Sequence, residues 1–289
     1  MKNPILKNCA DPDAAVFNGK MYVYPTTDGV GGWDKATSFK VYSSEDLENW
    51  KDEGVILDFK DVPWTEGICA WAPAICEKNG KYYFYFTGHY QIGVAVSDSP
   101  TGKFEAKDSP LIEKVRYDTI DPDVFIDDDG QAYLYWGNTH MYVAKLAENM
   151  MELASEPMEI TPSNYNEGTC VFKRNGIYYY TWSKGDTRSP DYHVRYGKGT
   201  SPMQKPEGDT VILHRDFAED KRIRCTAHHT IVNIPGTDEW YILYHRFNVE
   251  KYGDVEGFSD EAGSQRETCI DRLYFDEDGN ILPVKPTNE

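Results

Sequence analysis

The stretch DPDVFIDDDGQAYLYW, residues 121–136, decides the fold, because in it two runs of β-branched and aromatic residues flank an Asp-Gly pair. This pattern is typical of a β-hairpin with a tight turn. It recurs along the chain with turn glycines 46 to 61 residues apart, and these glycines are Gly19, Gly80, Gly130, Gly176 and Gly236. A repeat of this length has the size of one four-stranded unit and indicates a repeat architecture.

A further strand-like segment follows each of the first four hairpins, and a short polar turn follows that segment. These segments are residues 39–44, 92–99, 141–146 and 192–199. No long segment has the i, i+3, i+4, i+7 pattern of an amphipathic helix. Five all-β units predict a five-bladed β-propeller, since such folds have four to eight blades. A β-sandwich is the alternative, but it gives no reason for the repeat.

The composition is that of a folded globular chain with 289 residues, 40% hydrophobic and 14% aromatic. Length alone fits one or two domains, but no linker or low-complexity tract separates the repeats, so we expect a single domain over residues 1–289. The polar segment Glu250–Ser264, with three glycines, is the candidate for a mobile insertion.

The net charge and the start of the chain indicate which partners and which compartment to expect. The net charge of −18 makes nucleic acid and anionic membrane surfaces improbable partners. The start of the chain lacks the apolar region of a signal peptide, so we expect a cytoplasmic protein. Six widely spaced cysteines without a CxxC pair predict reduced, buried thiols.

One chemically capable side chain precedes each turn glycine by eight or nine residues. These side chains are Asp11, Trp71, Asp121, Glu167 and His228. If the first strand of every hairpin lines a central channel, all five surround one mouth of the axis. Asp11 and Asp121 each precede a proline, which restricts the chain as it enters the strand. The sequence therefore predicts a site with three carboxylates at that mouth.

These motifs in combination resemble glycoside hydrolase family 43. The resemblance covers the whole chain, from ADPD at residues 10–13 to RLYFDEDGNILPV at residues 272–284. It implies a five-bladed propeller that hydrolyses β-xylosides, α-L-arabinofuranosides, arabinan or galactan with inversion. It also implies that Asp11 is the general base, that Glu167 of NEGTC is the general acid, and that Asp121 of IDPD orients Glu167 and raises its pKa.

The resemblance extends to three residues beside the carboxylates. Trp71 of WAP resembles the residue that packs on the sugar, and Arg266 of QRETC resembles an arginine that hydrogen-bonds it. His228 of AHHTIV resembles the axial histidine near which many members hold calcium. A lone imidazole is a poor site for Ca²⁺, which prefers six to eight oxygens, so water would have to supply most ligands. The alternative is an axial histidine that is hydrogen-bonded without a metal.

Glycoside chemistry explains why several carboxylates are needed. The oxocarbenium-like transition state requires one protonated carboxyl at the leaving oxygen and one ionised carboxylate. Inversion requires a separation of roughly 6.5–9.5 Å between them, which leaves room for water. A third carboxylate near the acid keeps it protonated through like-charge repulsion.

Weaker candidates surround this predicted site. Asp28 and Arg188 lie in loops after two of the catalytic strands and are expected to contact the sugar. Tryptophans could form an aromatic rim, since sugars pack their C–H faces on aromatic rings, and the candidates are Trp33, Trp64 and Trp136. His229 should point away from His228, because strand neighbours alternate faces.

The predicted function is an exo-acting, inverting glycosidase that releases pentose from xylo- or arabino-oligosaccharides of hemicellulose. β-D-xylosidase is the first hypothesis, and α-L-arabinofuranosidase or a bifunctional enzyme is the alternative. Endo-arabinanase is a weaker alternative, because a cytoplasmic enzyme would meet small imported fragments. A non-catalytic sugar-binding propeller belongs to a different class. A buried cluster of carboxyls argues against it, since like-charge repulsion costs stability without helping a binding site.

Overall fold

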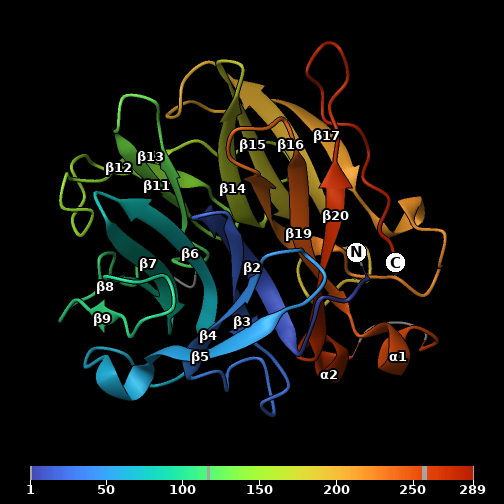
Figure 1. The fold of residues 1–289 in the computed structure, drawn as a ribbon, viewed down its shortest axis with the longest axis horizontal. Coiled ribbons are helices and arrows are strands. Elements are labelled where there is room, and N and C mark those ends of the chain that lie inside the picture. The colour runs from blue at the N-terminus through green and yellow to red at the C-terminus, as the bar shows by residue number, and fades with distance from the viewer. Residues whose placement is uncertain (1, 116–117, 256–258, 289) are drawn as a thin grey trace.

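The computed structural model describes residues 2–115, 118–255 and 259–288, which form five four-stranded antiparallel sheets around one axis (Figure 1). This arrangement confirms the predicted five-bladed β-propeller and rules out the β-sandwich. In each sheet the strands lie side by side in chain order, except in the fifth. None of the described helices is long and apolar enough to span a membrane.

The blades follow one another along the chain. Blade 1 contains β2 (Cys9–Phe17), β3 (Lys20–Thr27), β4 (Ser38–Ser44) and β5 (Lys51–Asp58). Blade 2 contains β6 (Ala70–Lys78), β7 (Lys81–Gly88), β8 (Gln91–Ser97) and β9 (Glu105–Ala106). Blade 3 contains β10 (Asp123–Ile126), β11 (Ala132–Trp136), β12 (Tyr142–Lys145) and β13 (Met158–Glu159). Blade 4 contains β14 (Glu167–Arg174), β15 (Ile177–Lys184), β16 (His193–Gly199) and β17 (Glu207–Leu213).

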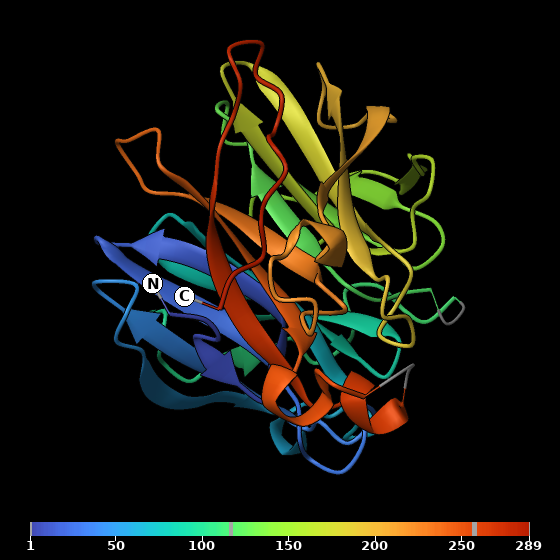
Figure 2. The same cartoon turned by 90° about the vertical axis from the view of Figure 1, so that its right-hand side faces the viewer.

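Blade 5 joins the two ends of the chain. It contains β18 (Ala227–Asn233), β19 (Trp240–Phe247), β20 (Arg266–Leu273) and, as its outer strand, β1 (Leu6–Lys7) from the N-terminal segment. β1 pairs antiparallel with β20, and the labelled N- and C-termini lie close together in both views (Figures 1 and 2). The ring is therefore closed by hydrogen bonds between the first and last strands.

Short helices lie between the strands. The 3₁₀ turns η1 (Phe59–Asp61) and η2 (Arg215–Phe217) follow the fourth strands of blades 1 and 4. The helices α1 (Val249–Tyr252) and α2 (Asp260–Gly263) lie in the polar segment between β19 and β20, at one end of the propeller in Figure 2. Residues 256–258 lie outside the described part, so the predicted mobility of Glu250–Ser264 is not addressed there.

The innermost strands β2, β6, β10, β14 and β18 contact one another in a closed ring around the axis. Aromatic side chains fill the space between neighbouring blades, as Phe39 of blade 1 and Phe84 and Phe86 of blade 2 show. All six cysteines are buried and free, as expected from their spacing.

A residue with positive φ lies within two residues of the start of each inner strand, and four of these residues coincide with a β-bulge. The residues are Asp11, Ala72, Asp121, Gly168 and His228. Trp71 and Glu167 each come one residue earlier, so the five predicted side chains occupy two neighbouring positions instead of one. In blade 3 the offset from the turn glycine is one residue larger, because the turn at residues 127–131 is longer than the tight turns of blades 1, 2 and 4.

Candidate active site

The positive-φ residues are held in place by the preceding blade. A side chain near the end of the second strand of one blade accepts a hydrogen bond from the backbone N–H of the positive-φ residue in the next blade. We call this contact an inter-blade clamp. The clamps run from Thr26 to Ala72, from Thr87 to Asp121, from Ser183 to His228 and from His245 to Asp11, at 2.7, 3.0, 3.0 and 3.3 Å.

The junction between blades 3 and 4 lacks such a side chain, because glycine occupies the clamp position. Gly137 has a φ of 132°, and a Cβ there would lie 1.9 Å from the carbonyl oxygen of His140. The backbone N–H of Gly168 interacts instead with the carboxylate of Asp121, and this contact opposes the rise in the pKa of Asp121 that burial causes. Because Gly137 has no side chain that could accept it, the N–H of Gly168 is available to orient Asp121.

A cavity of about 680 Å³ opens at this mouth of the propeller. All three predicted carboxylates line it, together with His228, Trp71, Arg188 and Arg266. Its walls come from loops of all five blades, through Trp33, Tyr90, Asn138, Thr187 and Asp260. Loops of all five blades therefore surround the cavity, which is open to solvent at the mouth of the propeller.

Asp11 is a buried carboxylate held by a cation. Arg266 donates to its two oxygens, from Nη1 at 2.7 Å and from Nη2 at 3.3 Å. Burial by itself would raise the pKa of Asp11, but Arg266, with His228 and His245, outweighs burial and holds this pKa well below its usual range. Asp11 is therefore ionised at neutral pH.

Glu167 has the opposite electrostatic character. Burial, with help from the charges of Asp186 and Asp11, raises its pKa to about 7, although the hydrogen bond from Tyr192 works against this shift. The Tyr192 hydroxyl donates to Oε1 at 2.6 Å, and the Asn138 amide donates to Oε2 at 2.6 Å. Glu167 is therefore fixed in orientation and can carry a proton near neutral pH.

Asp121 lies beside Glu167 and shares its titration. Burial, and then the charges of Glu167 and Asp11, raise the pKa of Asp121 well above its usual range. Its Oδ2 atom is buried and has no hydrogen-bond partner within the described part of the chain. Burial is the largest cause of the raised pKa of Glu167, and the mutual repulsion between the Asp121 and Glu167 charges acts in the same direction, so the predicted role of Asp121 stays a prediction. The two carboxyls are best described as a pair that retains a proton at neutral pH.

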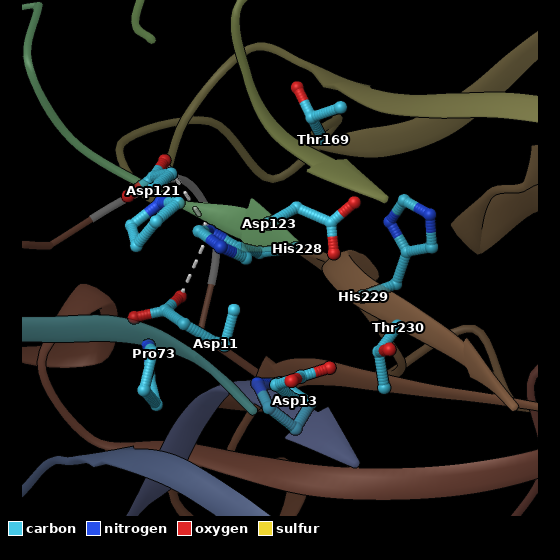
Figure 3. Close-up of a pocket in the computed structure, with 12 residues that line it drawn as sticks. Asp11, Asp13, Pro73, Asp121, Asp123, Thr169, His228, His229 and Thr230 are labelled. Atoms are coloured by element: carbon cyan, nitrogen blue, oxygen red, sulfur yellow. Dashed lines mark ion pairs between the residues drawn. The ribbon is translucent and has the colours of Figure 1, made fainter. Parts of the chain in front are cut away.

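His228 lies on the axis between two of the carboxylates. Its Nδ1 is 3.2 Å from Asp11 Oδ1 and 4.0 Å from Asp121 Oδ2, and Figure 3 shows both contacts as dashed lines. A second cavity of about 10 Å³, the size of about one water, adjoins these residues and contains further carboxyls from Asp13 and Asp123.

The side chains around His228 supply some, but not all, of the ligands that a hard cation needs. Ligand atoms of Asp121, Glu167 and His228 lie within 4.8 Å of one another. The unpartnered Oδ2 of Asp121 supplies an oxygen donor, and burial lowers the pKa of His228 against the pull of Asp11, so its imidazole is neutral. The protein supplies fewer oxygens than Ca²⁺ requires, so most of its ligands would be waters.

Comparison with known proteins decides the family. The model of glycosyl hydrolases family 43 matches residues 1–281. This chain belongs to that family. It is therefore a glycoside hydrolase, and the predicted resemblance is confirmed.

Relatives of this family 43 enzyme are similar over nearly its whole length. A β-D-galactofuranosidase of Aspergillus niger is 36% identical, with 99% of this chain and 86% of the relative covered. A xylosidase/arabinosidase of Bacteroides ovatus is 32% identical, with 97% and 96% covered. Among solved structures, a β-xylosidase/α-arabinofuranosidase from a compost metagenome, in complex with xylotriose and in calcium-free form, has a TM-score of 0.82 at 28% identity, with 98% and 96% covered.

Arg266 of the family 43 enzyme lines the cavity, and its predicted contact with a sugar stays a prediction, but Asp28 does not take the predicted place. Asp28 is buried and does not line the cavity; it binds the guanidinium of Arg266 at 2.9 and 3.0 Å. The guanidinium of Arg266 donates to Asp28 and Asp11, and its Nη1 also lies 3.4 Å from His245 Nδ1. The sequence could not show this pairing, because the two acids flank the arginine from another blade.

An aromatic wall lines the blade 1 and blade 2 side of the cavity. Trp71 lies between Trp33 and Tyr90, with ring centroids 5.4 Å from each, and its indole N–H donates to the Trp33 carbonyl at 2.7 Å. Trp33 is 50% exposed, so its ring is available to a sugar. Trp64 and Trp136 do not form part of the rim, because they stack in the interior on Phe86 and Tyr142.

Two other predicted residues lie near the cavity with different partners. Arg188 lines it but is exposed and paired with Asp186. His229 points away from His228, as predicted (Figure 3). It lines the small axial cavity and its Nε2 is 2.6 Å from Thr181 Oγ1 (Figure 3).

Several functional residues had no signal in the sequence motifs. Tyr192, Asn138 and Asn166 bind Glu167 from loops or strand starts, where no periodicity marks them. His245 could have been found, because it ends the second hairpin strand of blade 5, where Thr26 and Ser183 stand in blades 1 and 4.

Proposed function

We propose that this enzyme is an exo-acting, inverting glycosidase that releases pentose from xylo- or arabino-oligosaccharides, with β-D-xylosides as its main substrates. The observation that carries the proposal is an ionised carboxylate, Asp11, and a carboxyl with a raised pKa, Glu167, in one cavity. Two carboxyls with different protonation are what glycosidic hydrolysis requires.

The roles follow from these environments. Asp11 accepts a proton from the attacking water, and Arg266 keeps it ionised and fixes its orientation. Glu167 donates a proton to the leaving oxygen, and Tyr192 and Asn138 aim its carboxyl. Asp121 shares the proton of Glu167 and so extends the pH range in which that group is an acid.

The walls of the cavity support exo-action. Loops from all five blades surround it, so one end of an oligosaccharide can enter but a polymer cannot lie across it. The aromatic wall of Trp33 and Trp71 offers a face on which a pentose ring can pack. Family relatives named xylosidase/arabinosidase support the choice of a pentose.

β-D-Galactofuranosidase is the second candidate, because the Aspergillus relative at 36% identity has that activity in its name. β-D-Galactofuranose and α-L-arabinofuranose have the same ring configuration and differ by one hydroxymethyl group outside the ring. An arabinofuranosidase pocket with space beside that carbon would therefore accept both.

A panel of nitrophenyl glycosides tests the substrate. We expect the highest kcat/KM with β-D-xyloside and a lower value with α-L-arabinofuranoside. A higher kcat/KM with β-D-galactofuranoside than with either pentoside would replace the proposal by the second candidate. Failure to hydrolyse all three glycosides and xylobiose would reject both.

The pH profile tests the role of Asp121. Because Asp121 and Glu167 retain a proton as a pair, Asp121→Asn removes one of the two repelling charges and should lower the pKa of Glu167. The alkaline limb of kcat/KM against pH is then expected at lower pH than in the wild type. An unchanged alkaline limb would show that Asp121 does not support the acid.

We also propose a calcium ion beside His228, since its neutral imidazole and the free oxygen of Asp121 are available to it. A cation there would supply positive charge that favours the ionised forms of nearby carboxylates. Chelator should lower activity and added Ca²⁺ should restore it, and His228→Ala should abolish this response more than His229→Ala does. Full wild-type activity after extensive chelation, with no metal detected by elemental analysis, would contradict the proposal.

A further inference from the structure

One of the four inter-blade clamps differs from the others in its hydrogen-bond acceptor. At three of the clamps the acceptor is a hydroxyl, supplied by Thr26, Thr87 and Ser183. At the junction between blades 5 and 1, the acceptor is the imidazole of His245, which is completely buried. The residue that it holds is Asp11, the proposed general base.

The Nδ1 atom of His245 faces two donors. The backbone N–H of Asp11 is 3.3 Å away, and Nη1 of Arg266 is 3.4 Å away. Arg266 Nη1 is also 2.7 Å from Asp11 Oδ1, which itself lies 3.0 Å from His245 Nδ1. With a lone pair on Nδ1, His245 accepts from the Asp11 N–H and from Arg266; with a proton on Nδ1, it donates to Asp11 Oδ1. In either tautomer the atom binds groups that hold the general base.

The imidazole of His245 also packs against Tyr192, the residue that binds the general acid. The ring centroids of His245 and Tyr192 are 5.4 Å apart, and the Tyr192 hydroxyl donates to Glu167 at 2.6 Å. Threonine or serine at this position would be too short to reach Tyr192. Histidine satisfies the clamp and also packs against Tyr192, which binds Glu167.

We infer that His245 is a positioning residue that fixes the general base Asp11 relative to the general acid Glu167. The inference rests on the proposed roles of these two carboxyls. In an inverting enzyme their relative placement determines whether a water fits between the base and the sugar. A displacement of about 1 Å at such a group can lower the rate by about 10²-fold.

Two substitutions distinguish the effect of the hydrogen-bonding atom Nδ1 from the effect of the ring that packs on Tyr192. In His245→Asn, the amide Oδ1 can stand where Nδ1 stands and accept the N–H of Asp11. In His245→Phe, an aromatic ring still fills the space beside Tyr192, but no acceptor remains. We expect His245→Phe to lose about 10²-fold in kcat with little change in KM. His245→Asn should recover most of this loss.

The loss in His245→Phe should be equal for nitrophenyl xyloside and xylobiose, because a displaced base affects every substrate alike. Thr26→Val is the matched control, since it removes the same kind of clamp from Ala72, which has no side chain suited to catalysis. It should keep kcat close to the wild type. Thermal unfolding of each variant confirms folding, and His245→Leu replaces the Phe variant if the latter does not fold.

Equal kcat values for the Asn and Phe variants would overturn the inference, because the acceptor would then have no effect. A loss in Thr26→Val as large as in His245→Phe would overturn it as well, since the clamps would then act through the stability of the blades. Asp11→Asn, measured in parallel, distinguishes this failure from that of the proposed function. An active Asp11→Asn rejects the proposed function, whereas an inactive one beside an active His245→Phe rejects only the positioning role.

Discussion

Asp11→Asn is expected to lower kcat by about 10²–10⁴-fold, the usual contribution of a general base. The amide cannot accept a proton from water, although it can still hydrogen-bond Arg266 and keep the geometry of the site. The loss should be similar for activated aryl glycosides and for xylobiose, because water must be activated in both reactions. Steady-state kinetics with both substrates measure it.

Asp13→Asn is the matched control for this variant. Asp13 belongs to the same DPD triplet and is also engaged with backbone, since its Oδ2 accepts the N–H of Ile75 at 2.7 Å. It lines the small axial cavity and not the large one, and an asparagine Oδ1 can still accept that N–H. It should retain most of the activity. An Asp11→Asn enzyme within tenfold of the wild type would remove the role of base from Asp11.

Glu167→Gln is expected to show the second large effect, and its size should depend on the leaving group. A sugar alkoxide needs a proton as it departs, so hydrolysis of xylobiose should fall by about 10²–10⁴-fold. A nitrophenolate leaves without protonation, so the loss with nitrophenyl xyloside should be much smaller. Comparing kcat/KM for the two substrates tests the assignment.

The glutamine in this variant can still bind Tyr192 and Asn138, so the site should keep its shape. The alkaline limb of the wild type near pH 7, where Glu167 loses its proton, should also be absent from the variant. Equal losses with both substrates would indicate that Glu167 does not protonate the leaving group.

The fold and the three carboxylates could be predicted because each depends on a local pattern that is repeated. The hairpins with turns at Gly19 and Gly176 have alternating residues and a tight turn, which need no tertiary context. Strand β1 could not be predicted, because two residues are too few for an alternating pattern and its partner β20 lies at the other end of the chain.

The partners of the carboxylates could not be predicted for a different reason. The pairing of Arg266 with Asp28 depends on how blades 5 and 1 meet. The pairing of Glu167 with Tyr192 joins β14 to the segment just before β16 within blade 4, and no residue spacing encodes it. Trp136 shows the same limit, because the sequence marks an aromatic strand residue but not the face on which it packs.

The anomeric configuration of the first sugar released tests the central claim most directly. If Asp11 activates a water and Glu167 protonates the leaving oxygen, a β-xyloside must give α-xylose first. Proton NMR during early hydrolysis should show the α-anomeric signal rise before mutarotation produces the β-anomer. The early appearance of β-xylose would mean retention, and it would contradict the water-mediated mechanism proposed for this enzyme.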